Sequence, residues 1–204
     1  MTLLTITEHV REEMIEKAKR DRPHETCAFL LGEDDHIDEY YEMKNINQGL
    51  EELLEIEGFS QGLLDQLDNE LALNDESGKT NVNKATREEL QQLNGINEEL
   101  ADRIIQRRQR AGRYEDPEIH FKFDPGDQAK AQKYSIQNQT DIVGVYHSHP
   151  HHDSEAYPSD ADQEMGHKGY IYFILNFQPE ETIIRAFEMG DEAVEEIEFE
   201  VTDS

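Results

Sequence analysis

The sequence has little positive charge, almost no cysteine and no long apolar run. Among its 204 residues, 47 acidic side chains face 19 basic ones, and the net charge is −28. A single cysteine, Cys27, excludes a disulfide framework within the chain and a zinc site built from several cysteines. We therefore expect a protein of a reducing compartment.

Long hydrophobic segments are also missing. The N-terminus has a four-residue apolar stretch before charges begin, and no window approaches the roughly 18 apolar residues of a membrane span. The sequence therefore predicts a cytoplasmic protein without membrane contact.

The acidic residues are spread along the chain instead of forming a tail. Residues 178–204 hold ten acids and one arginine, yet Ile197, Phe199 and Val201 still alternate as they would on one face of a strand. Periodicity of this kind indicates a folded protein with a highly charged surface. A high-salt cytosol, in which screening weakens self-repulsion, gives this surface a physical rationale, so we expect a halophilic protein.

Both ends of the chain together predict a mixed α/β unit. Thr7 is a plausible N-cap for a helix that Pro23 ends, and "TCAFLLG" at 26–32 is typical of a buried strand. Further elements are expected as helices at 126–138 and from "SDADQEM", and as strands at 2–6, 36–44, 141–149, 169–176, 182–189 and 193–201.

The middle of the chain repeats itself. Residues 50–67 align without gaps to residues 87–104, an offset of 37. The identical pairs are Glu51/Glu88, Glu52/Glu89, Leu53/Leu90, Gly58/Gly95, Leu63/Leu100 and Asp65/Asp102. Each copy indicates a helix, a glycine-containing hairpin and a second helix, and two copies can bury an apolar face that neither covers alone.

The second copy resembles the helix-hairpin-helix motif of ComEA-type DNA-binding domains, in which hairpin glycines let backbone amides meet phosphate. Gly95 is present, whereas Asn97, which tolerates a left-handed conformation, stands at the second glycine position. Candidate nucleic-acid contacts within residues 79–113 are Gly95, Asn97, Arg103, Arg107, Arg108, Arg110 and Arg113. Residues 50–76 hold nine acids and no basic residue, so a structural or protein-binding insert is favoured over nucleic-acid contact.

A histidine pair follows in "YHSHPHHDSEAYPSDAD" at 146–162. His147 and His149 are two residues apart at a predicted strand end, so their side chains share a face. An aspartate among residues 159–162, at a predicted helix start, could turn back toward them. Two imidazoles and one carboxylate are the protein ligand number of many catalytic zinc sites, although a lone H-x-H is more often an exposed pair.

Four separated elements resemble the JAMM (MPN+) metalloprotease family. They are "PHETCAFLLG" at 23–32, Asp124-Pro125, "GVYHSHP" at 144–150 and "PSDAD" at 158–162. The resemblance covers residues 2–47 and 119–201. It implies an α/β fold with a cytidine deaminase-like mixed sheet flanked by helices, formed by residues 1–47 and 119–204. Residues 48–118 would be an inserted all-α tandem helix-hairpin-helix domain.

The resemblance also implies the role of each site residue. His147, His149 and Asp162 would hold Zn²⁺, Glu25 would move the proton of the attacking water, and Ser159 would donate to the developing oxyanion. Cys27 is expected to pack in the core rather than act as a nucleophile.

The family pattern has two fewer residues between the second histidine and the serine. The extra residues fall within 151–155, so that His151, His152 or Asp153 could approach the metal, although solvated loop residues are the simpler interpretation. Ala28 also replaces a usual glycine.

The resemblance implies hydrolysis of the amide bond after the C-terminal tail of a ubiquitin-like modifier or a ThiS/MoaD-like sulfur carrier. The alternatives are a DNA-associated, RadC-like protein and a non-catalytic MPN scaffold. The carrier, the choice of peptide or isopeptide bond and the oligomeric state stay open.

Overall fold

The computed structural model describes residues 3–75, 78–115, 117, 120–151, 155–166, 169–190 and 193–203. The chain divides into two compact units, one formed by Met1–Ile46 with Glu118–Ser204 and the other by Asn47–Pro117. The first is an α/β unit and the second consists mainly of short helices. Within the described residues, no helix is long and apolar enough to cross a membrane.

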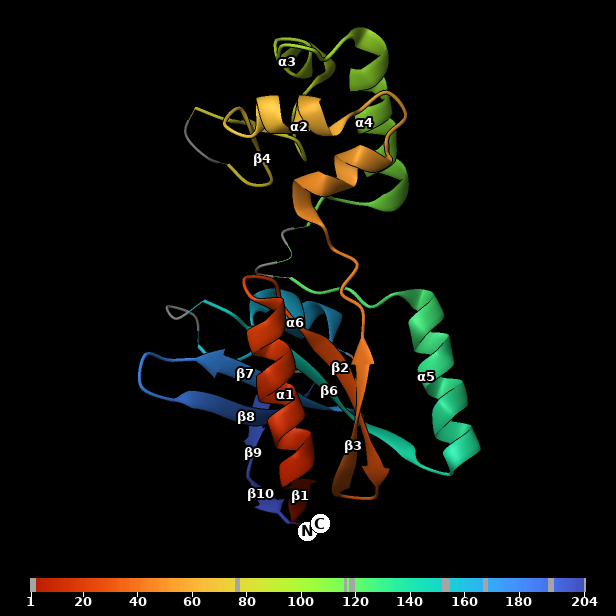
Figure 1. The fold of residues 1–204 in the computed structure, drawn as a ribbon, viewed down its shortest axis with the longest axis vertical. Coiled ribbons are helices and arrows are strands. Elements are labelled where there is room, and N and C mark those ends of the chain that lie inside the picture. Colours follow the sequence, from red (N-terminus) through yellow and green to blue (C-terminus); the bar gives the residue numbers. More distant parts are fainter. Residues whose placement is uncertain are drawn as a thin grey trace. The chain divides into compact units, whose positions relative to one another are not determined.

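An eight-stranded mixed sheet forms the α/β unit, in the order β10-β1-β3-β2-β6-β7-β8-β9 (Figure 1). β1 pairs in parallel with β10 and β3, β6 pairs in parallel with β7, and the other neighbours are antiparallel. The strands are β1 (Leu4–Thr7), β2 (Cys27–Glu33), β3 (His36–Met43), β6 (Asp141–His149), β7 (Ile171–Phe177), β8 (Thr182–Met189), β9 (Val194–Ile197) and β10 (Phe199–Thr202). The predicted mixed α/β fold is confirmed.

Two helices cover opposite faces of the sheet (Figure 1). α1 (Glu8–Asp21) follows its N-cap Thr7, whose hydroxyl accepts a hydrogen bond from the backbone amide of Val10. It buries three apolar residues in the cluster that includes Leu30 of β2. Residues next to Leu30 in the strand point the other way, into the cluster of α5 (Pro125–Asn138).

The predicted single strand at 193–201 is wrong. The chain breaks at Glu198, so that Ile197 ends β9, which pairs with β8, whereas Phe199 begins β10, which pairs with β1. Consecutive segments therefore supply both edges of one sheet. An alternation of apolar residues indicates extended backbone but carries no signal for a change of pairing partner.

The second unit places the two sequence repeats around one apolar cluster. The first copy has a 3₁₀ helix η1 (Gly49–Glu55) and α2 (Gln61–Leu67), and the second copy has α3 (Arg87–Leu90) and α4 (Glu98–Ala111). Two short strands, β4 (Leu71–Ala72) and β5 (Thr80–Asn81), pair in parallel and were not predicted. The shared cluster includes Leu53, Ile56, Phe59, Leu64, Leu67, Leu90, Leu93, Ile96, Leu100 and Ile104.

Each hairpin glycine packs against the second helix of the other copy. A Cβ on Gly95 would lie 2.6 Å from a methyl carbon of Leu63, and one on Gly58 would lie 4.0 Å from the corresponding methyl of Leu100. Both glycines have positive φ angles, of 95° and 93°. Gly58 and Gly95, like Leu63 and Leu100, are related by the offset of 37, so the copies pack reciprocally.

Hydrogen bonds between the copies follow the same relation. The Gln66 side chain donates to the Asn94 carbonyl at 2.9 Å, and the Arg103 guanidinium donates to the Glu57 carbonyl. The two donors, Gln66 and Arg103, are 37 positions apart, and so are the two acceptors, Glu57 and Asn94. The internal repeat in the sequence thus corresponds to a pseudo-symmetric pair of helix-turn-helix units in this part of the chain.

Candidate metal centre

The two histidines lie at the end of β6, in the middle of the sheet. His147 pairs in register with Cys27 of β2 and His149 with Asn176 of β7. Both side chains point to the same face because they are two residues apart in a strand. His147 is fully buried and His149 nearly so.

The aspartate comes from the start of a short helix, α6 (Asp160–Met165). Ser159 is its N-cap and accepts a hydrogen bond from the backbone amide of Asp162 at 3.2 Å. In return, one carboxylate oxygen of Asp162 accepts hydrogen bonds from the Ser159 amide at 2.8 Å and hydroxyl at 2.7 Å. This reciprocal capping box fixes the carboxylate at the helix start.

Three ligand atoms converge on one point. The Nε2 atoms of His147 and His149 are 3.1 Å apart. The Asp162 carboxylate lies 3.4 Å from Nε2 of His147 through Oδ1, and 3.6 Å from Nε2 of His149 through Oδ2. Among the described residues these three side chains form a group able to hold a metal ion, with ligand atoms within 4.8 Å of one another.

Neighbouring groups determine which histidine ring nitrogen carries a proton, and a metal requires a ring nitrogen without one. Nδ1 of His149 lies 2.7 Å from the Glu155 carbonyl, which accepts only, so Nδ1 carries the proton and Nε2 of a neutral ring keeps a lone pair. The His147 ring stacks on Phe121, with ring centroids 4.7 Å apart. In the part of the chain that the structure describes, two imidazole nitrogens and a carboxylate form a donor set that fits zinc.

Asp162 is ionised in this environment. Its burial would by itself raise the pKa of the carboxyl group, but positive charge on His147 and hydrogen bonds from the His147 and His149 rings and the Ser159 hydroxyl outweigh burial and hold the pKa well below its usual range. A metal cation in place of the ring protons would lower this pKa in the same direction. A carboxylate that stays charged at neutral pH is ready to coordinate a cation.

Glu25 lies beside this group, two residues before β2. Its side chain is buried, with Oε1 3.9 Å from Nε2 of His149. The side-chain amide of Asn45 donates to the Glu25 backbone carbonyl at 3.1 Å and to the His120 carbonyl at 3.2 Å, which ties three segments together. Burial excludes the alternative that Glu25 is an ordinary surface carboxylate.

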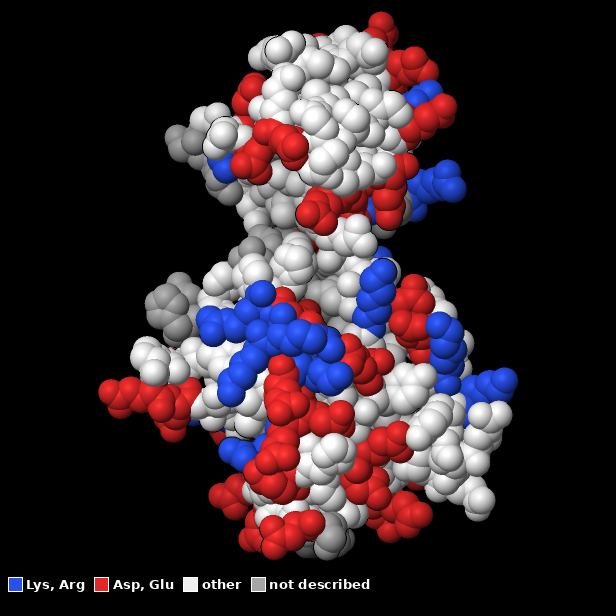
Figure 2. All heavy atoms as spheres, viewed as in Figure 1, with Lys and Arg blue, Asp and Glu red and all other residues white. Residues whose placement is uncertain are grey.

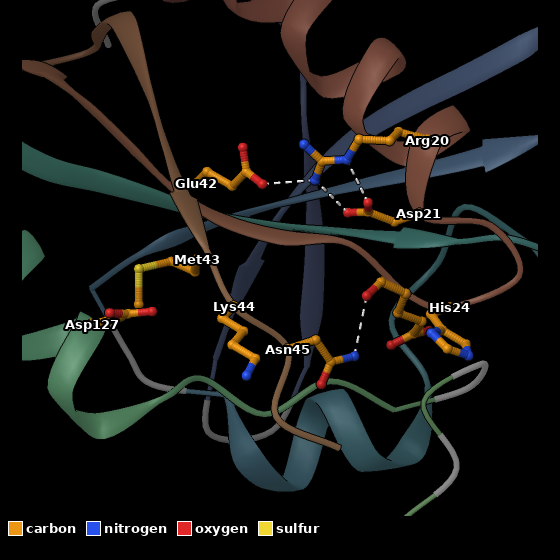
Figure 3. A pocket seen from close by; sticks show the side chains of 9 residues that line it. Arg20, Asp21, His24, Glu42, Met43, Lys44, Asn45 and Asp127 are labelled. Atoms are coloured by element: carbon orange, nitrogen blue, oxygen red, sulfur yellow. Dashed lines mark hydrogen bonds and ion pairs between the residues drawn. The ribbon is translucent and has the colours of Figure 1, made fainter. Parts of the chain in front are cut away.

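A cavity of about 520 Å³ opens beside Glu25. Arg20 and Asp21 line it from the end of α1, and Lys44 and Asn45 line it from the segment after β3 (Figure 3). Glu25 lines this cavity, whereas His147, His149 and Asp162 are not among its lining residues.

Ser159 and Cys27 have the following surroundings. The Ser159 hydroxyl donates to the Asp162 carboxylate, so in this structure it orients a candidate ligand, and donation to an oxyanion stays a prediction.

Cys27 packs in the core as predicted. Burial, and after it the charge of Glu25, raises the pKa of its thiol. A thiol of that kind is a poor nucleophile at neutral pH.

The longer loop after His149 is described in part. The backbone carbonyl of His151 accepts a hydrogen bond from Asn176, and His151 is not part of the metal-binding group. His152 and Asp153 lie outside the described residues.

Asn176, which no sequence motif marks, holds the end of β6 in place. Its side chain is fully buried, and its amide nitrogen donates to the carbonyls of His149 at 3.0 Å and His151 at 2.8 Å. Its oxygen accepts a hydrogen bond from Gln178. A single asparagine in an apolar strand carries no motif, so its role becomes visible when the register opposite His149 is known.

We expect Asn176→Leu to raise the zinc dissociation constant by roughly 10- to 100-fold, as does the loss of a residue that orients a metal ligand. Leucine has a similar size but cannot donate to the His149 and His151 carbonyls, so the His149 ring loses its fixed position. Zinc competition with a chelator measures the effect, and Asn138→Leu, on exposed helix surface, is the control. A folded Asn176→Leu protein with unchanged zinc affinity would contradict this role.

In the second unit, three of the candidate arginines have partners within that unit. Arg103 bonds the Glu57 carbonyl and pairs with Glu99 at 2.8 Å. Arg107 pairs with the buried Glu52 and lies over the Tyr114 ring, 4.3 Å from its centroid.

Arg108 donates to the Val82 and Ala85 carbonyls, both at 2.8 Å. Arg110 and Arg113 are exposed.

Gly95 and Asn97, the hairpin residues predicted to contact phosphate, have structural roles within the unit. Gly95 needs its positive φ angle and its lack of a side chain because Leu63 lies against it. Asn97 does not use the left-handed conformation expected of it. With φ at −85° it caps α4, and its side chain accepts a hydrogen bond from the Leu100 amide at 2.8 Å. Capping asparagines prefer extended backbone, which explains the difference.

The chain has similarity to several proteins of known structure. A solution structure of a protein from Desulfitobacterium hafniense has 19% sequence identity and a TM-score of 0.61, over 99% of this chain and 94% of its own. A JAB1/MPN domain protein from Archaeoglobus fulgidus has 15% identity and a TM-score of 0.46, over 99% and 100% of the two chains. A JAMM structure, presented as a metalloprotease-like zinc site in the proteasome and signalosome, has 15% identity and a TM-score of 0.43, over 98% and 99%.

No curated protein matches the sequence. The family model of the prokaryotic homologs of the JAB domain, however, matches residues 7–189, which contain the whole candidate metal centre. Since this match spans most of the chain, the protein belongs to the prokaryotic homologs of the JAB domain.

Proposed function

We propose that the protein is a zinc-dependent peptidase or isopeptidase that hydrolyses the amide bond after the C-terminal tail of a ubiquitin-like modifier or sulfur carrier protein. The observation that carries this proposal is the convergence of His147, His149 and Asp162 next to the buried Glu25 carboxylate. The neighbour presented as a metalloprotease-like zinc site supports zinc as the metal.

The chemistry follows from the positions of the side chains. Zinc at such a centre supplies a Lewis acid and lowers the pKa of water toward about 7. Glu25 takes a proton from the attacking water and passes it to the leaving amine. Ser159 orients Asp162 and, by rotating its hydroxyl, donates to the oxyanion that develops on the scissile carbonyl.

A non-catalytic scaffold would need none of these groups. A structural zinc site fills all four ligand positions, whereas among the described residues three side chains converge with a carboxylate beside them. The buried carboxylate has no packing advantage over an apolar residue. Its presence supports an enzyme.

The insert, in this proposal, is a tandem helix-hairpin-helix domain that selects a protein substrate. The reciprocal packing of its two copies supports the tandem arrangement. Three of five candidate arginines already have partners within the unit, and residues 50–76 add nine acids, so little positive potential remains for phosphate. These observations favour protein contact over the DNA-associated alternative.

The test uses a ThiS/MoaD-like carrier joined through its C-terminal Gly-Gly to a second protein. The zinc-loaded wild type is expected to release a carrier that ends at Gly-Gly, as measured by intact-mass spectrometry. Glu25→Gln is expected to retain the fusion on an affinity column without cleaving it, because binding survives when proton transfer is lost. A fusion with an altered terminal dipeptide is the control. Intact Gly-Gly fusions after prolonged incubation with wild type, across several carriers, would refute the proposed substrate class.

A further inference from the structure

Positive charge gathers at one place on the α/β unit. Four of the nineteen basic residues lie within residues 17–22, at the C-terminal end of α1. Figure 2 shows them as a compact group of Lys and Arg on a face where acidic side chains predominate below it. With Lys44, which lines the neighbouring cavity, they form the α1 basic patch: Lys17, Lys19, Arg20, Arg22 and Lys44.

The patch keeps an excess of positive charge after its internal pairs are formed. Arg20 bonds Asp21 at 2.6 Å and Glu42 at 2.7 Å, and Lys17 pairs with Glu42 at 2.7 Å. The five cations exceed the two carboxylates paired with them by three, on a protein whose net charge is −28, while Glu25 and Asp127 also line the neighbouring cavity. Lys19 and Lys44 are exposed and available to a partner.

Two contacts connect the patch to the candidate metal centre. Arg20 and Lys44 line the cavity that Glu25 also lines (Figure 3). Arg22 donates to the Pro150 carbonyl at 2.9 Å and lies over the Phe177 ring at 4.9 Å, and Pro150 directly follows a metal-binding histidine. A partner held by the patch would therefore lie at the cavity that Glu25 also lines.

We propose that the α1 basic patch docks an acidic face of the folded substrate protein while the tail of that protein enters the cavity beside Glu25. This inference rests on the proposed function and adds a property of the substrate: acidic side chains near its C-terminal tail.

Charge complementarity explains why the occupant is an acidic protein. The acidic remainder of the surface repels such a partner, so that the patch fixes the orientation of approach as well as adding attraction. Where salt is high, screening leaves mainly the direct contact pairs. Lys19 and Lys44 can make such pairs because neither is tied to a carboxylate in the described structure, whereas Lys17 and Arg20 are.

A nucleic acid fits the same patch less well. Asp21 and Glu42 lie among the cations, and phosphates follow one another along a strand, so that some of them would face these carboxylates. Acidic side chains on a folded protein can be spaced so that none of them faces Asp21 or Glu42.

The experiment measures carrier binding in a Glu25→Gln background, so that cleavage does not interfere. The probe is an acidic ThiS/MoaD-like carrier labelled with a fluorophore, and the dissociation constant is measured by anisotropy at several KCl concentrations. Lys19→Glu and Lys44→Glu are each expected to weaken binding by roughly 5- to 10-fold, with a smaller effect as KCl rises. Lys133→Glu, an exposed residue of α5 with the same charge change, is the control and should alter binding less than twofold.

Each outcome bears on the patch. Equal effects at Lys19, Lys44 and Lys133, or no binding of the carrier by the Glu25→Gln protein, would overturn the docking proposal. Duplex DNA that displaces the carrier and loses affinity in the same two variants would make the patch a nucleic-acid surface instead. If the carrier binds through the patch but the wild type never cleaves it, the proposed function fails and the docking surface stands.

Discussion

Glu25→Gln is expected to lower the turnover of a Gly-Gly carrier fusion by roughly 10²- to 10⁴-fold, the usual contribution of a general acid–base group. The same protein should keep about one zinc per chain, since catalytic centres of this type hold the metal by three other side chains. Glutamine has nearly the shape of glutamate, and the buried position 3.9 Å from His149 remains filled. The change therefore separates proton transfer from metal binding.

Asp127→Asn is the matched control for this experiment. Asp127 lines the same cavity, but its carboxylate pairs with Lys130 at 2.7 Å and does not belong to the metal-binding group. Loss of this carboxylate should change turnover by less than about threefold, as expected for an exposed ion pair. Equal losses in both variants would point to the electrostatics of the cavity, and an active Glu25→Gln enzyme would mean that another group moves the proton.

The candidate site could be predicted from the sequence because its groups lie in short, separated patterns. His147 and His149 share a face through their spacing alone, and Ser159 with Asp162 forms a capping box that local sequence favours. The contact of these patterns with Glu25, 122 residues away, could not be derived from spacing. It required the resemblance to a family, and the pairing of β2 with β6 is its structural basis.

The supporting residues could not be predicted, since they act through sheet register. Asn176 matters because β7 lies beside β6 with Asn176 opposite His149, and Asn45 matters because its amide reaches the Glu25 carbonyl. The split of the last strand has the same origin. Pairing partners at a sheet edge are a tertiary property, which local alternation does not record.

The partners of the charged side chains in the insert could not be predicted from the sequence either. The repeat and its apolar positions were visible in the sequence. A run of arginines, however, does not indicate whether each side chain pairs within the protein or faces solvent. Arg107 is neutralised by Glu52, and Arg108 donates to two backbone carbonyls, contacts that join segments 23 to 55 residues apart. Charge counting therefore overstated the positive surface of this unit.

His147→Ala is expected to abolish stable zinc binding. The change leaves one imidazole and one carboxylate, and two protein ligands hold zinc much less tightly than three. His147 is fully buried and stacked on Phe121, so alanine also leaves a cavity beside that ring. Metal analysis after dialysis should find far less zinc than in wild type, with turnover lost in parallel.

The specificity of this result depends on a second histidine variant and on folding. His9 lies on the exposed side of α1 and pairs with Glu13 at 3.6 Å, so His9→Ala should keep its zinc. Because the alanine at 147 could unfold the protein, His147→Gln is the companion: it fills more of the cavity and still lacks the imidazole nitrogen. Circular dichroism must show that this companion is folded. Full zinc occupancy in a folded His147→Gln protein would remove His147 from the metal centre, and the mechanism assigned to Glu25 would then have no metal beside it.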